Sequence, residues 1–395
     1  MKRRAFCAVL GVGSIAGCLR LEEEEGGDAG DEPSGQDDAD GQRQQPGAEE
    51  PQAGDGKEDP DIELSEAWSH EGFSHPFVYD GQFVGRHDGD INILSRSGEV
   101  VWSSDTGGVD RYTVWPTAGS GFATNDDSVF VHYISFSSEV DKDARVYAFD
   151  ADTGEQQWLY QTDRRGLQAM TADDDTVYFG GYTGDNADDR TYQVTAVDGT
   201  TGQRQWSRQV RDDSLADMVV YDSTLYVGQS ELYTMNPDDG EIQTEYDINV
   251  RVRGFLPRLG EERLYLTDRD TLTRFDLEAD QLRSTVAFDE RLDRPTIGEG
   301  VIYSGRRDGV VTAYNIENGT ELWQNRVDGR VVHSALDSGI LWVLDTTGLV
   351  TALDTDTGGV LYQRTVEDSE NRVAALDGRV FISEHYWEAY DIERA

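Results

Sequence analysis

The sequence predicts an all-β fold, an eight-bladed β-propeller of four-stranded antiparallel blades. Three observations lead to this prediction. A motif of the form Ala-x-Asp-x-x-Thr-Gly-x-x-x-Trp returns along the chain at intervals of about 40 residues, the length of one propeller blade. Each interval contains short β-rich runs separated by turn residues. The last unit is one strand short of a complete blade, and an extra strand precedes the first unit.

The first 17 residues resemble a signal peptide of the twin-arginine type. Arg3 and Arg4 precede an apolar run that is too short to span a bilayer, which needs about 20 residues. Lys2 stands where Ser or Thr is usual before the arginine pair. Residues 15–18, Ile-Ala-Gly-Cys, resemble the lipobox of lipoproteins, and this resemblance implies that Cys18 is lipidated. We therefore expect a lipid anchor on the extracytoplasmic face of the cell membrane.

Residues 18–61 form a predicted acidic tether that stays solvated, because they contain almost no large apolar side chain. Residues 21–62 hold 16 acidic and 2 basic side chains, a charge of −14. The whole chain carries −44 and the first 20 residues +4, which leaves −34 for residues 63–395. An acidic tail on an ordinary domain would account for less than half of the excess. The composition, with Arg far exceeding Lys, resembles the haloarchaeal type that is adapted to molar salt.

The folded domain is predicted over residues 62–395. The Asp-equivalent position of the motif marks eight units, at residues 95, 150, 198, 236, 276, 315, 354 and 391. The best copies of the motif contain Asp150, Gly154 and Trp158; Asp198, Gly202 and Trp206; Asn315, Gly319 and Trp323; and Asp354, Gly358 and Tyr362. Units four and five have Thr244 and Ser284 in place of the Trp. Seven blades followed by a disordered end is the alternative.

Each motif residue has an expected structural role. The Asp side chain can accept hydrogen bonds from N–H groups of the turn between the third and fourth strands, and the Gly can take the positive φ that closes this turn. We expect the Trp ring to lie between neighbouring blades, with its N–H on a backbone acceptor.

The seventh and eighth units illustrate the strands within each blade. The expected strands of the seventh unit are residues 331–336, 340–344, 349–353 and 360–366, and those of the eighth unit are residues 372–376, 380–383 and 387–392. The eighth unit then lacks an outermost strand. Residues 62–70, with Trp68, precede the first inner strand at 75–79, and we expect them to complete the eighth blade and remove its exposed edge.

The repeated motif resembles the tryptophan-docking repeat of pyrroloquinoline-quinone-like β-propellers, a family that includes the propeller lipoproteins of the outer-membrane barrel assembly machinery. The enzymes of this family hold a quinone with Ca²⁺ and a disulfide of adjacent cysteines. The chain has no adjacent cysteines, and cleavage before Cys18 leaves only one. It also shows no spacing typical of metal ligands or of a nucleophile. We therefore expect no cofactor, no metal and no catalytic residue, and the protein is not expected to be an enzyme.

Arginines recur just before the predicted innermost strands. Equivalent positions in successive blades lie on a ring, so these residues can form an anion site at one channel mouth: Arg111, Arg165, Arg253, Arg294, Arg330 and Arg372. The alternative is that each arginine pairs with a carboxylate of the neighbouring blade. The acidity of the chain as a whole excludes a nucleic-acid partner held through phosphate contacts.

These observations predict a monomeric, lipid-anchored, extracytoplasmic scaffold without catalytic activity. Propellers bind partner proteins through exposed loops, and extended peptides through strand edges. Two alternatives remain open at this point, a quinone-dependent oxidoreductase and a cell-surface module that binds glycans.

Overall fold

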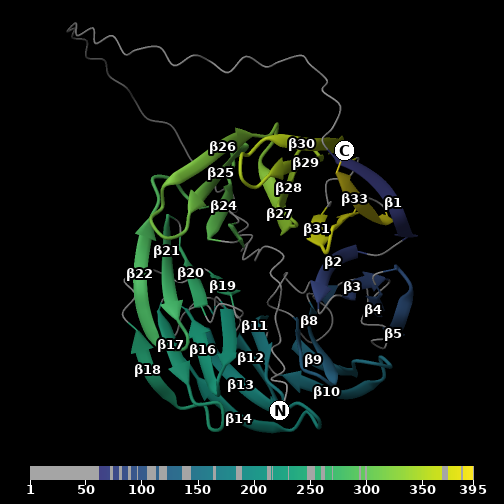
Figure 1. Cartoon of the computed structure of the whole chain (residues 1–395). Coiled ribbons are helices and arrows are strands. Elements are labelled where there is room, and N and C mark those ends of the chain that lie inside the picture. Colours follow the sequence, from purple (N-terminus) through teal and green to yellow (C-terminus); the bar gives the residue numbers. More distant parts are fainter. Residues whose placement is uncertain are drawn as a thin grey trace, which may run out of the picture. The chain divides into compact units, whose positions relative to one another are not determined.

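The computed structural model describes residues 62–394 except 72–73, 80–81, 88–89, 96, 105–112, 115–121, 136–143, 163–165, 184–188, 211–214, 216, 230, 247–253, 259–262, 269, 293–294, 299, 367–371 and 384–385. The described residues form β-strands and no α-helix. The strands belong to eight antiparallel sheets that follow one another round a ring (Figure 1). The predicted all-β propeller with eight blades is confirmed.

The strands of the first four blades run in chain order from the inside of the ring to the outside. Blade 1 holds β2 (Ser74–Tyr79), β3 (Gln82–His87), β4 (Asp90–Leu94) and β5 (Val100–Ser104); blade 2 holds β6 (Thr113–Val114), β7 (Phe122–Thr124), β8 (Ser128–Ser135), β9 (Ala144–Asp150) and β10 (Gln156–Thr162). Blade 3 holds β11 (Gly166–Ala172), β12 (Thr176–Thr183), β13 (Thr191–Asp198) and β14 (Arg204–Gln209); blade 4 holds β15 (Asp217–Tyr221), β16 (Thr224–Gly228), β17 (Leu232–Met235) and β18 (Ile242–Tyr246).

The remaining blades follow the same order. Blade 5 holds β19 (Gly254–Arg258), β20 (Arg263–Thr267), β21 (Thr271–Asp276) and β22 (Gln281–Ala287); blade 6 holds β23 (Thr296–Gly298), β24 (Val301–Gly305), β25 (Val310–Asn315) and β26 (Glu321–Arg326). Blade 7 holds β27 (Val331–Asp337), β28 (Ile340–Asp345), β29 (Leu349–Asp354) and β30 (Val360–Thr365); blade 8 holds β31 (Arg372–Leu376), β32 (Arg379–Ser383), β33 (Tyr386–Arg394) and β1 (Ile62–Glu71). The strands expected in the last two units agree with these bounds to within one or two residues.

Blade 2 departs from the four-stranded pattern. Its innermost position holds two short strands, β6 and β7, which both pair with β8. The sequence between them contains Pro116, Gly119 and Gly121. Pro cannot donate to a strand ladder and Gly weakens one, so a single continuous inner strand is not favoured there.

The N-terminal strand completes blade 8, as predicted. β1 pairs antiparallel with β33 from Ile62 opposite Arg394 to Glu71 opposite Tyr386, with a bulge at Ala67. Trp68 lies opposite Ala389 and packs at 5.8 Å from the ring of Phe381. The last blade therefore has no open gap on its outer side.

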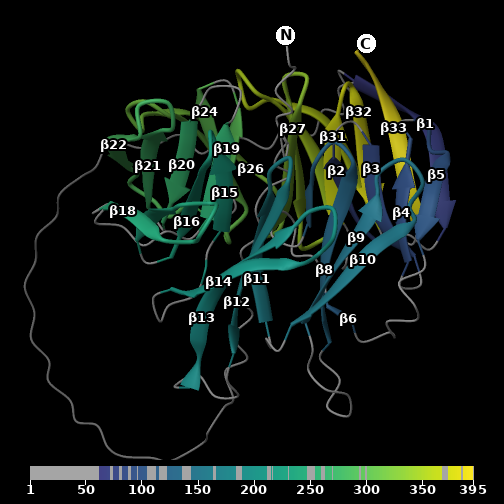
Figure 2. The ribbon, with the colours of Figure 1, turned by 90° about the horizontal axis from the view of Figure 1, so that it is seen from below.

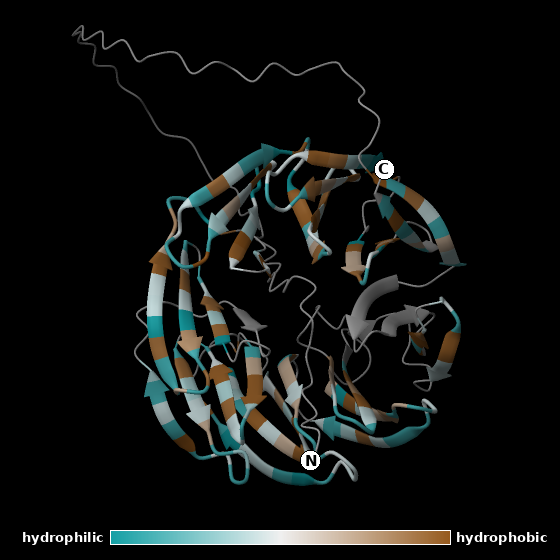
Figure 3. Ribbon diagram, viewed as in Figure 1, coloured by the Kyte–Doolittle hydropathy of each residue, from teal (hydrophilic) through white to brown (hydrophobic). Residues whose placement is uncertain are grey.

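Apolar side chains fill every junction between neighbouring blades, which we call a seam. The described residues form eight apolar clusters, each shared by two successive blades round the ring. Middle strands are buried on both faces, as in β28, where Trp342 is fully buried. Outermost strands are mostly exposed and bury single positions, as Trp323 on β26 shows. In Figure 3 hydrophilic and hydrophobic residues are interspersed along these strands.

The repeated turn has the predicted geometry. Asp198 Oδ1 accepts hydrogen bonds from the amides of Thr200 (3.1 Å) and Thr201 (2.7 Å) and from the Thr201 hydroxyl (2.8 Å). Gly202 has φ +68°, and its amide donates to the Asp198 carbonyl at 2.8 Å. The same arrangement surrounds Asp150 and Asp354, and Asn315 replaces the carboxylate in blade 6.

The Trp of one blade docks on the Gly turn of the next. Trp158 Nε1 donates to the Gly199 carbonyl at 2.8 Å, and a Cβ on Gly202 would lie 2.7 Å from the Trp158 ring. Trp102, Trp206 and Trp323 donate in the same way, to Ala151, Pro237 and Thr355 respectively. In the closing seam, Trp68 covers Gly98. A Cβ would force each of these rings away, which explains why Gly is required at the turn.

Tyr362 replaces the Trp of blade 7 for a topological reason. The fourth strand of blade 8 is β1, from the other end of the described chain, so blade 8 has no turn between its third and fourth strands on which an indole could dock. Tyr362 instead packs beside Trp342 in the cluster of blades 7 and 8. Arg364 reaches across the same seam to Tyr390 and Glu388.

Two other seams, on either side of blade 5, also lack the Trp. Between blades 4 and 5, the hydroxyls of Tyr226 (3.1 Å) and Tyr246 (2.5 Å) both donate to Asp280 Oδ1. Asp280 stands at the Gly position of the turn, with φ +49°. Between blades 5 and 6, Val286 covers Gly319, and Arg274 pairs with Glu317. Other contacts therefore take the place of the missing indoles.

Candidate binding surface

The strand order gives the ring two distinct faces. The turns that join first to second strands, and in blades 1 to 7 third to fourth strands, lie at one end of each blade, which we call the turn face. The loops from second to third strands and the links between blades lie at the other end, the connection face. Figure 2 shows the blades from the side, with β12 and β13 extending further than their neighbours.

The turn face is strongly acidic. Each repeated turn contributes carboxylates, and so do the hairpins between first and second strands, for example at Asp126, Asp127, Asp173, Asp174, Asp175, Asp222, Asp238, Asp239, Glu278, Asp356 and Asp377. The hydroxyl and amide of Thr153 hold the pKa of Asp150 below its ordinary value, and Thr201 has the same effect on the pKa of Asp198. Asp150 and Asp198 are structural caps of their turns, and both stay ionised at neutral pH.

Two of the six predicted ring arginines are described, and both lie on the connection face. Arg330 is exposed on the link before β27, where its amide donates to Thr346 Oγ1 at 3.1 Å and its carbonyl accepts from the Thr346 amide at 2.8 Å. Arg372 is half-buried and pairs with Ser383 at the start of β31. Arg111, Arg165, Arg253 and Arg294 lie outside the described residues.

A buried carboxylate fixes the link that presents Arg330. Asp345 is 2% exposed, and its Oδ2 accepts from the Gly329 amide at 2.7 Å. Its Oδ1 accepts from the amide (2.8 Å) and hydroxyl (2.6 Å) of Thr347. Burial of an ionisable group requires such partners. The backbone beside Arg330 is therefore held in one position.

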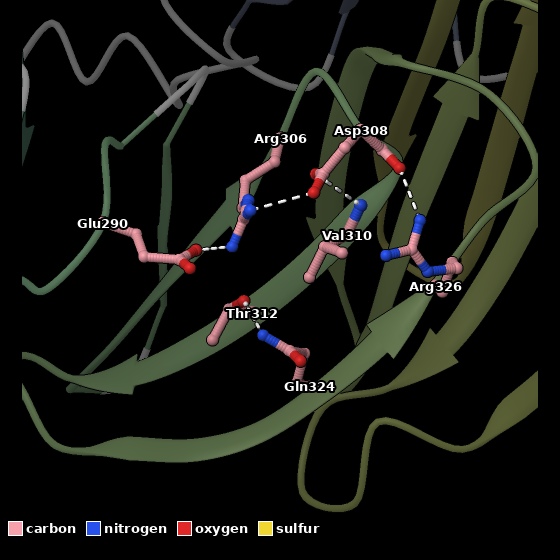
Figure 4. A network of polar contacts seen from close by, with 7 residues as sticks. All are labelled: Glu290, Arg306, Asp308, Val310, Thr312, Gln324 and Arg326. Carbon is pink, nitrogen blue, oxygen red and sulfur yellow. Dashed lines mark hydrogen bonds and ion pairs between the residues drawn. The ribbon is translucent and has the colours of Figure 1, made fainter. Parts of the chain in front are cut away.

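A second arginine centre, which the sequence did not single out, lies on the same face. Arg306 pairs with Glu290 and with Asp308, where Nη2 and Oδ2 are 2.8 Å apart, and Arg326 Nη1 donates to the Asp308 carbonyl at 2.8 Å (Figure 4). Although desolvation of the carboxylate works in the opposite direction, the Val310 amide and Arg306 hold the pKa of Asp308 below its ordinary value.

These residues place arginines among the carboxylates of the connection face in blades 5 to 7. Among the described residues, five arginines and seven carboxylates lie in its loops and links or at the adjoining strand ends: Arg291, Arg306, Arg307, Arg326 and Arg330, with Asp268, Asp270, Asp289, Glu290, Asp308, Asp328 and Asp345. The adjacent pair at 306–307 was the signal available in the sequence. It follows a second strand instead of preceding an innermost one, so the search for a ring of arginines missed it.

Exposed apolar side chains follow a simple rule in the described residues. The large hydrophobic residues that are exposed all lie on outermost strands: Val100, Val101, Leu159, Ile242, Leu322 and Val360. Each of these strands pairs on one side only. An unpaired edge with apolar side chains beside it is the surface on which an extended peptide can add as a further strand.

His132 is a buried titratable group in blade 2. It lies on β8, and strand alternation places it on the same face as Phe130, toward blade 3. It is 1% exposed and its Nδ1 has no hydrogen-bond partner. Burial lowers the pKa of His132 to about 4. The ring is therefore neutral at physiological pH and contributes no charge to either face.

No three or more His, Cys, Asp or Glu side chains of the described residues lie together so that they could hold a metal ion. The described part of the chain also contains no helix long and apolar enough to cross a membrane. Cys18, the predicted lipidation site, lies outside the described residues. The candidate features that the described residues do show are unpaired strand edges and the arginines of the connection face.

A family model described as outer membrane protein assembly factor BamB matches residues 87–254 and 249–391. No curated protein sequence matches this chain significantly. Together the two matched segments cover most of the propeller.

Several solved structures share the fold. BamB from Moraxella catarrhalis has a TM-score of 0.60 at 15% identity, over 83% of this chain and 97% of that one. The computationally designed protein Ika8 has a TM-score of 0.59 at 14% identity, over 82% and 96%. A quinohemoprotein alcohol dehydrogenase from Comamonas testosteroni has a TM-score of 0.58 at 13% identity, over 84% and 76%. At these identities the likeness concerns the fold alone.

Proposed function

Because this chain belongs to the protein family described as outer membrane protein assembly factor BamB, we propose that it is a non-catalytic scaffold that binds extended segments of partner proteins. The proposal includes a signal peptide over residues 1–17, a lipid on Cys18, a tether over residues 18–61 and a monomeric propeller over residues 62–395 outside the cell membrane. The family description supports protein assembly at a membrane, and the lipobox-like sequence supports the anchor.

One observation carries the binding role. The exposed large apolar residues of the described chain lie on outermost strands, each of which has one unpaired edge. Main-chain hydrogen bonds to such an edge supply affinity, and alternate side chains supply selectivity. Leu322 on β26 is 51% exposed, beside the docked Trp323. An added strand would cover Leu322 and leave the seam intact.

The connection face is the second proposed contact. We assign the six arginines of the predicted ring, with Arg306 and Arg326, to attraction of an acidic segment. Pairing across seams is the alternative role for an arginine, and Arg274 with Glu317 and Arg364 with Glu388 are examples of it. The examples come from third and fourth strands, whereas Arg330 lies on a link at the connection face.

A quinone-dependent oxidoreductase is the competing function, since one neighbour in fold is an alcohol dehydrogenase. The family's enzymes need acidic and amide ligands for Ca²⁺ and adjacent cysteines below the quinone. The cysteines of this chain are residues 7 and 18, and its described acidic residues do not converge on one point. The residues present therefore do not fit a quinone with its Ca²⁺ ion. The glycan-binding alternative has no specific observation in its favour.

Crosslinking followed by mass spectrometry in intact cells tests the proposal. We expect crosslinks from β26 and β30 to extended segments of other proteins, and Leu322→Lys with Val360→Lys should remove them. Glu321→Lys is the matched control, because it changes charge on the same strand without removing apolar surface. Crosslinks that survive the double variant would place the partner elsewhere. Cys18→Ser should release the protein from membranes if the anchor is correct.

A further inference from the structure

The turn between β25 and β26 in blade 6 carries a sequence that no other part of the chain has. Asn318-Gly319-Thr320 is an Asn-x-Thr acceptor for N-linked glycans, and no other Asn is followed two positions later by Ser or Thr. The short motif alone is a weak signal, because it occurs by chance in many proteins. Its position in the repeat and its geometry distinguish this copy from a chance occurrence.

Both motif residues replace the residues that the repeat has elsewhere. Asn318 stands where the sister turns have Thr153, Thr201 and Thr357. Thr320 stands where they have Glu155, Gln203 and Gly359. In a sister turn the Thr hydroxyl donates to the capping Asp, for example from Thr201 to Asp198 at 2.8 Å. In blade 6 the cap is Asn315, which accepts from the amides of Glu317 (2.9 Å) and Asn318 (3.2 Å). The Asn318 side chain takes no part in that cap.

The two acceptor side chains already contact each other in the folded protein. The amide of Thr320 donates to Asn318 Oδ1 at 3.0 Å, and the Thr320 hydroxyl donates to the same oxygen at 2.8 Å. A backbone N–H can only donate, so this contact fixes which atom of the carboxamide is oxygen. The bonds engage Oδ1 and leave Nδ2, the atom to be modified, on the other side of the carboxamide. Asn318 and Thr320 are both exposed on the turn face.

We propose that Asn318 is an N-glycosylation site, with a lipid-phosphate-linked oligosaccharide as the glycosyl donor. The Nδ2–C1 bond to the sugar forms while the bond between C1 and the phosphate oxygen breaks, Nδ2 loses a proton, and the lipid phosphate departs. A transferase of the host performs the step. This inference rests on the export in the proposed function. Twin-arginine export delivers folded chains, so only an acceptor that is exposed in the fold is available there.

The test is mass spectrometry of peptides from the full chain. The chain carries a second acceptor, Asn-Ala-Thr, inserted in the tether as a reference, and it is expressed in a host that glycosylates this reference. We expect a glycan mass on the peptide that contains Asn318. Asn318→Gln should lose the glycan completely. Thr320→Gln, which introduces the residue that blade 3 has at this position, should also lose it, whereas Thr320→Ser should retain it. Matching melting temperatures of the Gln variants would show that the fold is kept.

Two results would overturn the assignment: a reference sequence that is modified while Asn318 stays bare, or conversion of Asn318 to Asp by deamidation alone. A parallel chain with an unrelated export leader separates this inference from the proposed function. The chain with its own leader could stay inside the cell while the chain with the unrelated leader is glycosylated at Asn318. That result would contradict the proposed location outside the cell membrane and would support the glycosylation site.

Discussion

Five seams of the propeller are closed by a docked Trp, while the two seams that flank blade 5 are closed in another way. At a docked seam, one indole covers a Gly and donates to the next blade, as Trp158 does over Gly202. Between blades 4 and 5, two tyrosines reach a carboxylate instead. The loss of the Trp and the loss of the Gly occur together there, because the Asp280 side chain reaches toward blade 4, where a docked indole would otherwise lie.

The difference shows what a seam requires. Each kind combines an apolar cluster with a polar contact to the next turn. In the repeated motif the Trp side chain alone supplies the apolar packing and the polar contact. In the seam between blades 4 and 5, which we call the Tyr–Asp seam, two tyrosines, Tyr226 and Tyr246, make the polar contact to Asp280. Replacing Trp alone, without a change in the facing turn, should therefore be far more harmful than the natural absence of Trp in units four and five.

The largest expected effect is that of Trp158→Ala. It removes a buried indole that stacks on Phe130 and leaves the Gly199 carbonyl without its donor. We expect a loss of about 3–5 kcal/mol in the free energy of unfolding, measured by urea denaturation. Ser284→Ala, at the equivalent position beside blade 6, should cost less than about 0.5 kcal/mol. Equal losses would mean that the docked Trp does not carry the seam.

Acid should weaken a docked seam through His132. Its pKa is lowered to about 4 in the folded state, and the ordinary value is 6.5. The unfolded chain therefore binds the proton first, so this contribution to stability is present above pH 6.5 and is lost as the pH falls toward 4. The full loss is about 3 kcal/mol. Urea denaturation of the wild type and His132→Leu at pH 7 and pH 4 should show a smaller acid loss in the variant. An equal loss would assign the acid sensitivity to other groups.

Asp280 tests the Tyr–Asp seam. Asp280→Ala leaves the hydroxyls of Tyr226 and Tyr246 without this acceptor, and we expect a loss of about 1–3 kcal/mol in thermal or urea unfolding. Asp280→Gly should cost less, because Gly accepts the positive φ without strain. Asp280→Asn keeps an acceptor and should cost least. If Gly restored full stability, strain at φ +49° would be the main property of this position, and the hydrogen bonds would matter little.

The smallest effect is expected at the repeated caps. Thr201 holds the pKa of Asp198 below its ordinary value, so the stabilisation by this carboxylate is present at neutral pH and is lost as the pH falls through the lowered pKa. In blade 6 the uncharged side chain of Asn315 accepts the hydrogen bonds of the turn instead. Asp198→Asn should be nearly neutral at pH 7 and should reduce acid sensitivity. Asn315→Asp should increase it. Melting temperatures between pH 3 and pH 7 would reveal either change.

The sequence predicts the strands and turns well because both follow local rules. The turn motif and its spacing mark the blades, and the missing outer strand of the eighth unit leads directly to the pairing of residues 62–70 with β33. The role of Trp68 follows from the same logic. The break between β6 and β7 was missed, although Pro116 in that segment is a local signal against a continuous strand.

The surface was harder to predict, because it depends on contacts between distant blades. Arg306 meets Glu290 across a link, and Asp280 meets tyrosines of the preceding blade; neither pairing leaves a periodic trace in the sequence. The predicted arginine ring used a periodic rule, and its four members outside the described residues leave it a proposal. Asn318 was visible as a motif, but its exposure and its contact with Thr320 come only from the fold.

The pairing of β1 with β33 has a consequence for how the protein is made. During synthesis β1 emerges first and has no partner until Arg394 has been added, so the seven other blades assemble as an open array. Closing so long a loop adds little entropy cost, about 0.6 kcal/mol for each doubling of its length, but contacts this distant slow folding. A chain that ended before β33 would leave both β1 and β32 with an unpaired edge, the kind of edge on which other chains can add and aggregate.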